Sequence, residues 1–297
     1  MTGYRITHRT TYSYDDEVTD SLGIAHLVPR DLPWQSVTAH DIAVAPVPTD
    51  LSHDVDYYGN RATYFQVTDA HTKLEIEAVS EVDVSVPVVP DDALAVAWER
   101  ARPMANAATP GAWRATDFVL ESASAEQVEE AATYAAASFP GGRPVGEAVT
   151  DLMHRINADF EYDRTATTVT STVGEVLASR AGVCQDFAHL TLACLRSQGL
   201  AARYVSGYLS TLPAPGKQRV VGADASHAWV AVWLPDPSGA SEGSWLAFDP
   251  TNDQWVNDRY VTVAWGRDYS DVPPVKGVIF TEAKKSTLQV SVDVAPL

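Results

Sequence analysis

The spacing of apolar residues changes along the chain from a strand period to a helical one, and this change limits the possible folds more than any other feature. In the first 88 residues large or apolar side chains alternate with polar ones, as at Tyr4, Ile6 and His8 and again at Leu74 and Ile76. A period of two is typical of β-strands with one buried face. We therefore predict an N-terminal β-sandwich over residues 1–88.

Proline interrupts the alternation after this region. Pro87, Pro90, Pro103 and Pro110 fall within 24 positions where neither a helical nor a strand period is evident. Proline removes a backbone donor and disfavours helix at the preceding residue. We predict a connection between two domains over residues 89–117.

Helical patterns begin after the connection. Ser124 and Gln127 match a capping box and predict an alanine-rich helix that ends at Pro140. A second helix is predicted from about Val145 to Asp159, because its apolar residues share one face.

Another capping box, Thr172 with Glu175, predicts a short helix, and a longer helix is expected to begin at Cys184 and to end before Gly199. Strands follow at 202–209, 227–234 and 245–249. The second domain, residues 118–272, is therefore predicted to place helices on an antiparallel sheet, which gives an α+β protein. Residues 273–297 are predicted to form a strand-rich tail.

The two cysteines differ in their expected roles. They are Cys184 and Cys194, ten residues apart on one predicted helix, which separates them by about 15 Å and excludes a disulfide between them. A helix N-terminus favours thiolate over thiol, so Cys184 is a candidate nucleophile. The alternative for Cys184 is a small buried apolar residue, and we expect that role for Cys194. We also expect Gly182 to allow close approach of a substrate.

A histidine and an aspartate stand at the ends of two predicted strands. His227 begins one strand, and Asp249 ends the other 249 − 227 = 22 residues later. If the strands are neighbours, the imidazole and the carboxylate can meet at one edge of the sheet. The alternatives are a strand-end histidine bound to backbone and a turn aspartate before Pro250. His189 lies about 140° round the helix from Cys184 and is not expected to be the base.

Four sequence blocks, in this order, resemble those of the bacterial transglutaminase-like superfamily. They are Arg180–His189, Gly199–Tyr208, Ser226–Trp229 and Phe248–Asn252. The segment from Tyr4 to Val84 is similar to the β-rich N-terminal region of bacterial members, and the resemblance continues at Gly266–Pro274.

The resemblance implies a papain-like core in which Cys184 is the nucleophile, His227 the general base and Asp249 its orienting partner. Members include cross-linking transglutaminases, cysteine peptidases and deglycosylating amidases, all of which form a thioester from an amide. It implies a peptide or protein substrate. No EF-hand loop occurs in the sequence, so we expect no metal and no cofactor. Tyr162 and Trp255, with two other aromatic residues, Tyr208 and Trp229, are candidates to line a substrate cleft.

The net charge limits the expected binding partners, and the N-terminal sequence indicates the expected location of the protein. Lys and Arg total 21 against 39 for Asp and Glu, a net charge of −18, which argues against binding to nucleic acid or to an anionic membrane. The segment from Met1 to Glu17 has no apolar stretch of a signal peptide, so we expect a cytoplasmic protein.

We expect a cysteine peptidase or amidase, because water is the default acceptor and no sequence feature points to a site that excludes it. Transamidation and a non-catalytic binding or scaffold role are the alternatives.

Overall fold

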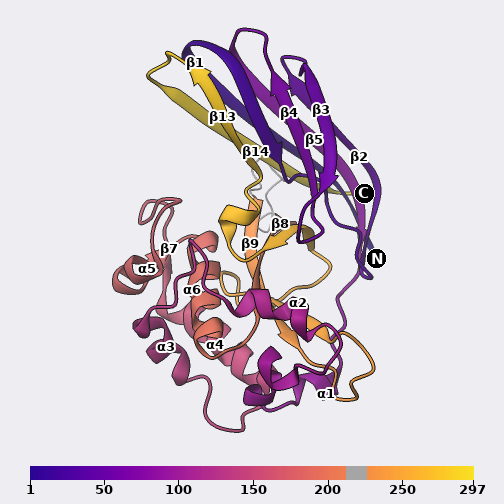
Figure 1. Cartoon of the computed structure of the whole chain (residues 1–297), viewed down its shortest axis with the longest axis vertical. Helices are drawn as coiled ribbons and strands as arrows, with labels where there is room; N and C mark the ends of the chain where they lie inside the picture. Colours follow the sequence, from indigo (N-terminus) through magenta and orange to yellow (C-terminus); the bar gives the residue numbers. More distant parts are fainter. Residues whose placement is uncertain (212–225) are drawn as a thin grey trace, which may run out of the picture.

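The structure, a computed structural model, describes residues 1–211 and 226–297. A curled β-sheet lies at the top of Figure 1, and a unit of helices packed on a second sheet lies below it. The predicted α+β class is therefore confirmed.

The N-terminal sheet is continuous and has seven strands. They are β1 (Thr2–Ala25), β2 (Gln35–Ala45), β3 (Asp50–Val55), β4 (Arg61–Val67), β5 (His71–Val84), β13 (Val275–Thr281) and β14 (Ser286–Pro296). The first half of β1 pairs with β5 and β14, and its second half pairs with β4 and β13. The register shifts between Ser13 and Val18, and such irregularities bend a strand.

The two halves of this sheet enclose an apolar cluster that includes Val44, Phe65 and Ile76. Gly23 leaves room for the Phe65 ring, because a Cβ there would lie 2.1 Å from Cζ of Phe65. The layers expected of a sandwich are thus the halves of a single sheet that curls about β1.

The C-terminal strands complete this sheet. β14 pairs with β1 from Tyr4 to Tyr14, and the Leu297 N–H donates to the Gly3 carbonyl at 2.9 Å. The two ends of the chain therefore lie side by side (Figure 1). The tail was predicted to form strands, and the structure shows that these strands belong to the N-terminal sheet.

The predicted connection contains short helices. They are α1 (Asp91–Leu94), α2 (Ala112–Thr116) and the 3₁₀ turns η1 (Trp98–Ala101), η2 (Pro103–Asn106) and η3 (Asp117–Val119). The longer helices of the second unit are α3 (Glu129–Ala136), α4 (Val145–Asp159), α5 (Val173–Ser179) and α6 (Cys184–Ser197).

The helix predictions held except at one N-terminus. α4 spans the predicted residues, and α5 has the predicted capping box of Thr172 and Glu175. The prediction that Ser124 caps α3 was wrong, since α3 begins at Glu129. The Ser124 N–H donates to Asp268 Oδ2 instead, at 2.7 Å, so a tertiary contact displaced the local motif.

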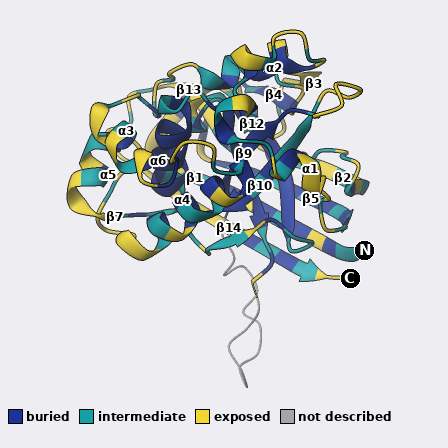
Figure 2. Ribbon diagram, turned by 90° about the horizontal axis from the view of Figure 1, so that it is seen from below, coloured by how far each residue is buried: buried dark blue, intermediate teal, exposed yellow. Residues whose placement is uncertain are grey.

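The second sheet is antiparallel, in the order β11-β10-β9-β8-β12. Its strands are β8 (Ala202–Leu209), β9 (Ser226–Leu234), β10 (Ser244–Asp249), β11 (Gln254–Trp255) and β12 (Tyr260–Gly266), and a 3₁₀ turn, η4 (Tyr269–Asp271), follows. α6 packs against β8 and β9 and is almost entirely buried (Figure 2).

Two buried amide side chains join the units at β12, an edge strand of the second sheet. Gln35 donates to the Thr262 carbonyl and accepts from the Thr262 N–H, both at 2.8 Å. Asn60 makes the same pair of bonds with Trp265, at 2.8 and 2.9 Å. Side-chain amides thus take the place of a further strand along this edge.

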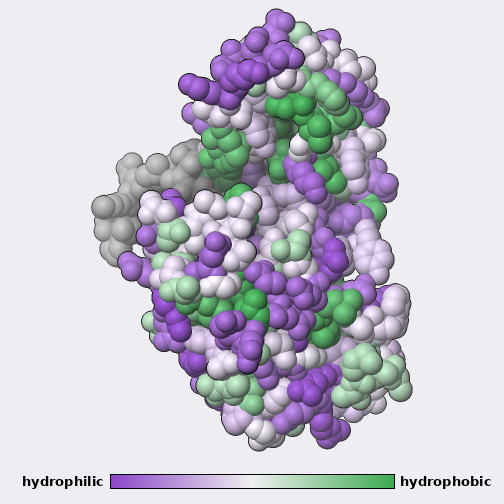
Figure 3. All heavy atoms as spheres, turned by 60° about the vertical axis from the view of Figure 1, so that its left-hand side comes forward, coloured by the Kyte–Doolittle hydropathy of each residue, from purple (hydrophilic) through white to green (hydrophobic). Residues whose placement is uncertain are grey.

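The surface is mixed in polarity, and Figure 3 shows apolar side chains gathered at the sheet end of the molecule. Exposed apolar residues of β13 and β14 include Val278, Phe280, Leu288 and Val290. In the described part of the chain, no helix has the length and apolar character needed to cross a membrane.

Candidate active site

Cys184 is the first residue of α6, as predicted, and is half-buried. The preceding residues form β7 (Ala181–Gly182), which pairs in parallel with β6 (Glu161–Tyr162) and fixes the direction in which the chain enters the helix. Asp186 closes the first turn, because its carboxylate accepts from the Val183 N–H at 2.8 Å. The sulfur is therefore held at a helix start, where backbone N–H groups favour negative charge.

Gly182 has a structural role at the start of α6, and its expected role toward a substrate stays a prediction. A Cβ at this position would lie 2.8 Å from Asp186 Oδ2 and 2.9 Å from Asp186 Cβ. The space that a side chain would need is therefore occupied by the carboxylate that caps α6. The absence of a Cβ serves the fold of the helix start, and this contact involves no substrate.

His227 and Asp249 meet as the strand argument predicted. β9 and β10 are hydrogen-bonded neighbours, and His227 Nε2 lies 2.7 Å from Asp249 Oδ2. Asp249 is fully buried, and only 10% of the His227 side chain is exposed. Since Nε2 bonds the carboxylate, Nδ1 is the ring nitrogen left to face another group.

Cys184 lies close enough to the His227 ring to be one of the groups that raise its pKa. Burial lowers the pKa of His227, but the hydrogen bond to Asp249, the interaction with Cys184 and their negative charges outweigh it and raise the pKa to about 10. Cys184, His227 and Asp249 thus lie together at one end of the second sheet. Their parts in a reaction remain predictions.

Asp249 accepts hydrogen bonds from several groups besides His227. Tyr260 Oη and Asn252 Nδ2 both donate to Oδ2 at 2.7 Å, and the Thr251 N–H donates to Oδ1 at 2.9 Å. Burial alone would raise the pKa of Asp249, but the bonds from His227, Asn252 and Tyr260 lower it below its usual range. The carboxylate is held ionised behind the imidazole.

Sequence reasoning missed Tyr260, Asn252 and Gln254. Gln254 Nε2 donates to Tyr260 Oη at 2.7 Å, so it orients the tyrosine that bonds Asp249. Asn252 lies within a block that carried the family resemblance, which was an available signal. Tyr260 begins β12, which does not pair with β10, so no local pattern could have indicated its contact.

His189 and Cys194 are structural, as expected. His189 Nε2 accepts from the Tyr269 N–H at 3.2 Å, and burial lowers its pKa to about 4. Cys194 is fully buried, its thiol donates to the Ala131 carbonyl at 3.6 Å, and burial raises its pKa to about 12. Both cysteines are free thiols.

The four candidate cleft aromatics divide by exposure. Tyr208 and Trp229 are buried in the core, whereas Tyr162 and Trp255 are 47% and 39% exposed. Tyr162 pairs with Gly182, two residues before the nucleophile candidate, and Trp255 pairs with Phe248, next to Asp249. Of these four residues, only Tyr162 and Trp255 reach the surface.

Comparison with known proteins finds matching families and similar proteins. Residues 4–83 match the family model described as the bacterial transglutaminase-like N-terminal region, and residues 131–250 match the transglutaminase-like superfamily. An uncharacterised protein of Mycobacterium tuberculosis is 49% identical over 99% of this chain and 92% of its own length. One from Mycobacterium leprae is 31% identical over 99% of this chain and 98% of its own.

A solved structure shares the fold across the whole chain. It is that of a candidate cysteine protease from Cytophaga hutchinsonii, with a TM-score of 0.75 and 18% identity, covering 100% of this chain and 98% of that one. The chain belongs to the transglutaminase-like superfamily and carries its bacterial N-terminal region.

Proposed function

We propose that the protein is a cysteine enzyme that cleaves amide bonds through a thioester on Cys184. The observation that carries the proposal is the hydrogen bond from His227 to the buried Asp249, with Cys184 near the imidazole at the start of α6. A nucleophile, a base and a group that orients the base are the three parts that nucleophilic catalysis needs.

In the first half of the reaction the Cys184 thiolate attacks the carbonyl carbon of the amide. N–H groups at the start of α6, that of Cys184 among them, stabilise the oxyanion. The C–N bond then breaks, and the proton on His227 Nδ1 passes to the leaving amine. The products are a thioester and a free amine or ammonia.

In the second half His227, now neutral, takes a proton from water, which attacks the thioester carbonyl. The C–S bond breaks, the acid is released, and the thiolate and imidazolium are restored. Water as the acceptor makes the enzyme a peptidase or amidase. An amine as the acceptor would make the same site a transglutaminase.

Peptides that contain glutamine and lysine test the proposal and distinguish the acceptors. Ammonia with conversion of the glutamine residue to a glutamate residue in the intact peptide indicates amidase activity, new termini indicate a peptidase, and an isopeptide indicates transamidation. The acyl group should be found on Cys184 by mass spectrometry after acid quenching. Exposed Tyr162 and Trp255 are expected to contact the peptide, so Tyr162→Ala should raise KM more than it lowers kcat.

The chain offers a matched control for the nucleophile. Cys184→Ala should abolish turnover and thioester formation, whereas replacing the buried Cys194 by alanine should leave both in place. Iodoacetamide should label Cys184 and spare Cys194 in the folded protein. Turnover that survives Cys184→Ala would refute the proposed reaction.

A further inference from the structure

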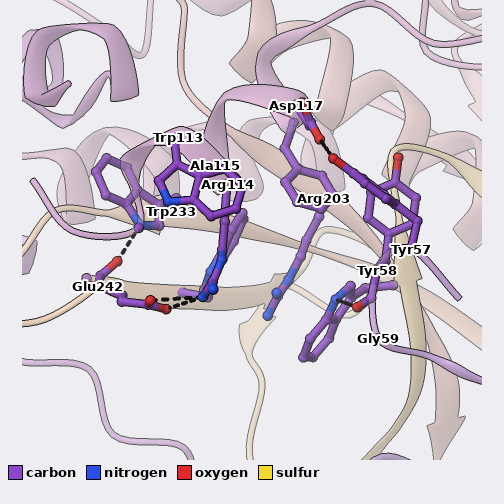
Figure 4. Close-up of a pocket in the computed structure, with 15 residues that line it drawn as sticks. Tyr57, Tyr58, Gly59, Trp113, Arg114, Ala115, Asp117, Arg203, Trp233 and Glu242 are labelled. Atoms are coloured by element: carbon purple, nitrogen blue, oxygen red, sulfur yellow. Dashed lines mark hydrogen bonds and ion pairs between the residues drawn. The ribbon is translucent and has the colours of Figure 1, made fainter. Parts of the chain in front are cut away.

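A cavity of about 490 Å³ lies where the N-terminal sheet, the connection and the second sheet meet. We name it the junction cavity, and its lining includes Tyr58, Trp113, Arg203, Trp233, Trp245 and Trp265. Its volume falls within the range of sites for small organic ligands. Figure 4 shows side chains of the cavity, among them those of Tyr58, Trp113, Arg203 and Trp233, converging from elements far apart in the sequence.

The junction cavity is separate from the candidate active site. Arg203 pairs with Ala231 on β9, and Trp233 lies two residues further from His227 along the strand. At about 3.3 Å per residue, the cavity lies roughly 13–20 Å from His227. Whatever binds here does not occupy the space beside Cys184.

Arg203 is the group in the cavity that needs an explanation. Its side chain is stacked between two indoles, with the guanidinium carbon 4.1 Å from the Trp245 ring centroid and 3.6 Å from that of Trp265. Only 6% of the residue is exposed. Arg30 lies 3.5 Å from the Trp265 centroid, so Trp265 is in contact with two cations.

The stacked rings satisfy the faces of the guanidinium but none of its N–H donors. Nε of Arg203 is buried without an acceptor, and among the described residues none accepts a hydrogen bond from this side chain. Buried polar groups are nearly always hydrogen-bonded. Burial, and secondarily the charge of Arg30, hold the pKa of Arg203 well below its usual value, which a bound anion would counteract.

Arg196 shows how this fold treats a structural arginine. It is equally buried, but its guanidinium donates to the carbonyls of Phe118, Ala202 and Arg267 and to the Ser122 hydroxyl. Arg203 has no such partners in the part of the chain that the structure describes, although acidic residues outnumber basic ones by 39 to 21 in the sequence. Its donors are left available on the side of the cavity.

The carboxylates of the cavity are already engaged elsewhere. Glu242 accepts from Arg114 at 2.8 and 2.9 Å, and Asp117 accepts from the Tyr57 hydroxyl at 2.7 Å (Figure 4). Neither forms an ion pair with Arg203 in the described structure. Within residues 1–211 and 226–297, a ligand would therefore meet one cation of the cavity that has no ion pair, with two carboxylates nearby that repel a second negative charge.

We propose that the junction cavity binds a small organic monocarboxylate, whose carboxylate pairs with Arg203 and whose apolar body lies against the aromatic walls. The planar guanidinium fork matches a carboxylate with two parallel hydrogen bonds. The indoles of Trp113, Trp233 and Trp245 supply apolar surface for the rest of the molecule. This site goes beyond the proposed reaction and does not depend on it.

Titration of the full-length protein with 4-phenylbutyrate and its neutral amide tests the proposal. The indole N–H resonances of Trp113, Trp233, Trp245 and Trp265 should shift with the acid, while that of Trp98, outside the cavity, should not. The acid should bind at least about tenfold more tightly than the amide, as expected for a charge-assisted pair. Inorganic phosphate should not compete, because it cannot use the aromatic walls.

Arg203→Gln should weaken binding of the acid to the level of the amide. Arg102→Gln is the matched control, because Arg102 also stacks on an indole, that of Trp98. This variant should bind the acid as the native protein does. Cys184 labelling should be unchanged in both. Equal binding of acid and amide, unshifted cavity indoles, or native affinity in folded Arg203→Gln would overturn the proposal. The acid and amide comparison needs no variant, so it decides even if Arg203→Gln does not fold.

Discussion

At the scale of single residues, the candidate site depends on side chains that orient other side chains. Asp249 is fully buried and bonded to His227, and Tyr260 and Gln254 extend the series behind it. Through Asp249 these groups fix His227 Nε2 and so leave Nδ1 as the ring nitrogen for another partner. A buried network of this kind is rigid when every member is satisfied.

Tyr260→Phe removes the hydroxyl bonded to Asp249 and keeps the ring packed against Trp229. Loss of a hydrogen bond to a charged group costs about 1.5–3 kcal/mol, so we expect kcat to fall roughly tenfold or more. KM should not change, since Tyr260 is behind the imidazole. Tyr208→Phe, which loses a hydroxyl bonded to His8, should keep native kcat. Equal kcat in the two variants would argue against a positioning role.

The pKa of His227, which is raised to about 10, predicts how the stability of the fold and the protonation of the imidazole depend on pH. The interactions that raise this pKa contribute fully to the stability of the fold below the ordinary histidine pKa of about 6.5. Their contribution is lost as the pH rises through 10. NMR of the imidazole should therefore find it protonated at pH 8 in the native protein. In Cys184→Ala one of the groups that raise the pKa is gone, so the imidazole should lose its proton at lower pH. Identical titrations would contradict the contact.

At the scale of secondary-structure elements, specific side-chain interactions occur at a helix start and at an edge strand. The start of α6 depends on Asp186 and on the missing Cβ of Gly182. The outer edge of β12 depends on Gln35 and Asn60, which take the backbone bonds that a neighbouring strand would take. The N-terminal sheet therefore supports the second sheet through side-chain amides.

Asn60→Ala should test this edge. The substitution leaves the N–H and carbonyl of Trp265 without their partners at a partly buried position, and each unsatisfied group costs up to about 1–3 kcal/mol. We expect the free energy of unfolding in urea to fall by roughly 2–4 kcal/mol. Asn106→Ala, at a partly exposed turn whose amide bonds carbonyls of its own segment, should cost less. A smaller loss at Asn60 than at Asn106 would refute the account.

At the scale of the whole molecule, the two ends of the chain close one sheet. β13 and β14 lie against opposite halves of β1, and Val292 and Val294 of β14 are fully buried in the core that the two units share. The apparent tail is thus part of the N-terminal unit.

Removal of residues 275–297 should prevent the N-terminal sheet from folding. The truncation removes the buried side chains of Val292 and Val294 from the core and leaves the β1 edge without β13 and β14, which also creates an aggregation-prone edge. Limited proteolysis should cut within β1 in the truncated chain only. Removal of Leu297 alone, which is 71% exposed, should have no such effect. A truncated chain as resistant as the native one would contradict this role of the tail.

The sequence by itself determined the local structure and the candidate triad. α4 and β8 have the predicted limits, and Cys184, His227 and Asp249 were selected as residues at the ends of elements, because period, caps and breakers act over a few positions. Only the tertiary structure decided the pairing of β14 with β1, the support of Asp249 by Tyr260 and the isolation of Arg203 in its cavity. Each of these joins positions distant along the chain, and such contacts are fixed by the packing of the whole fold, which no local pattern records.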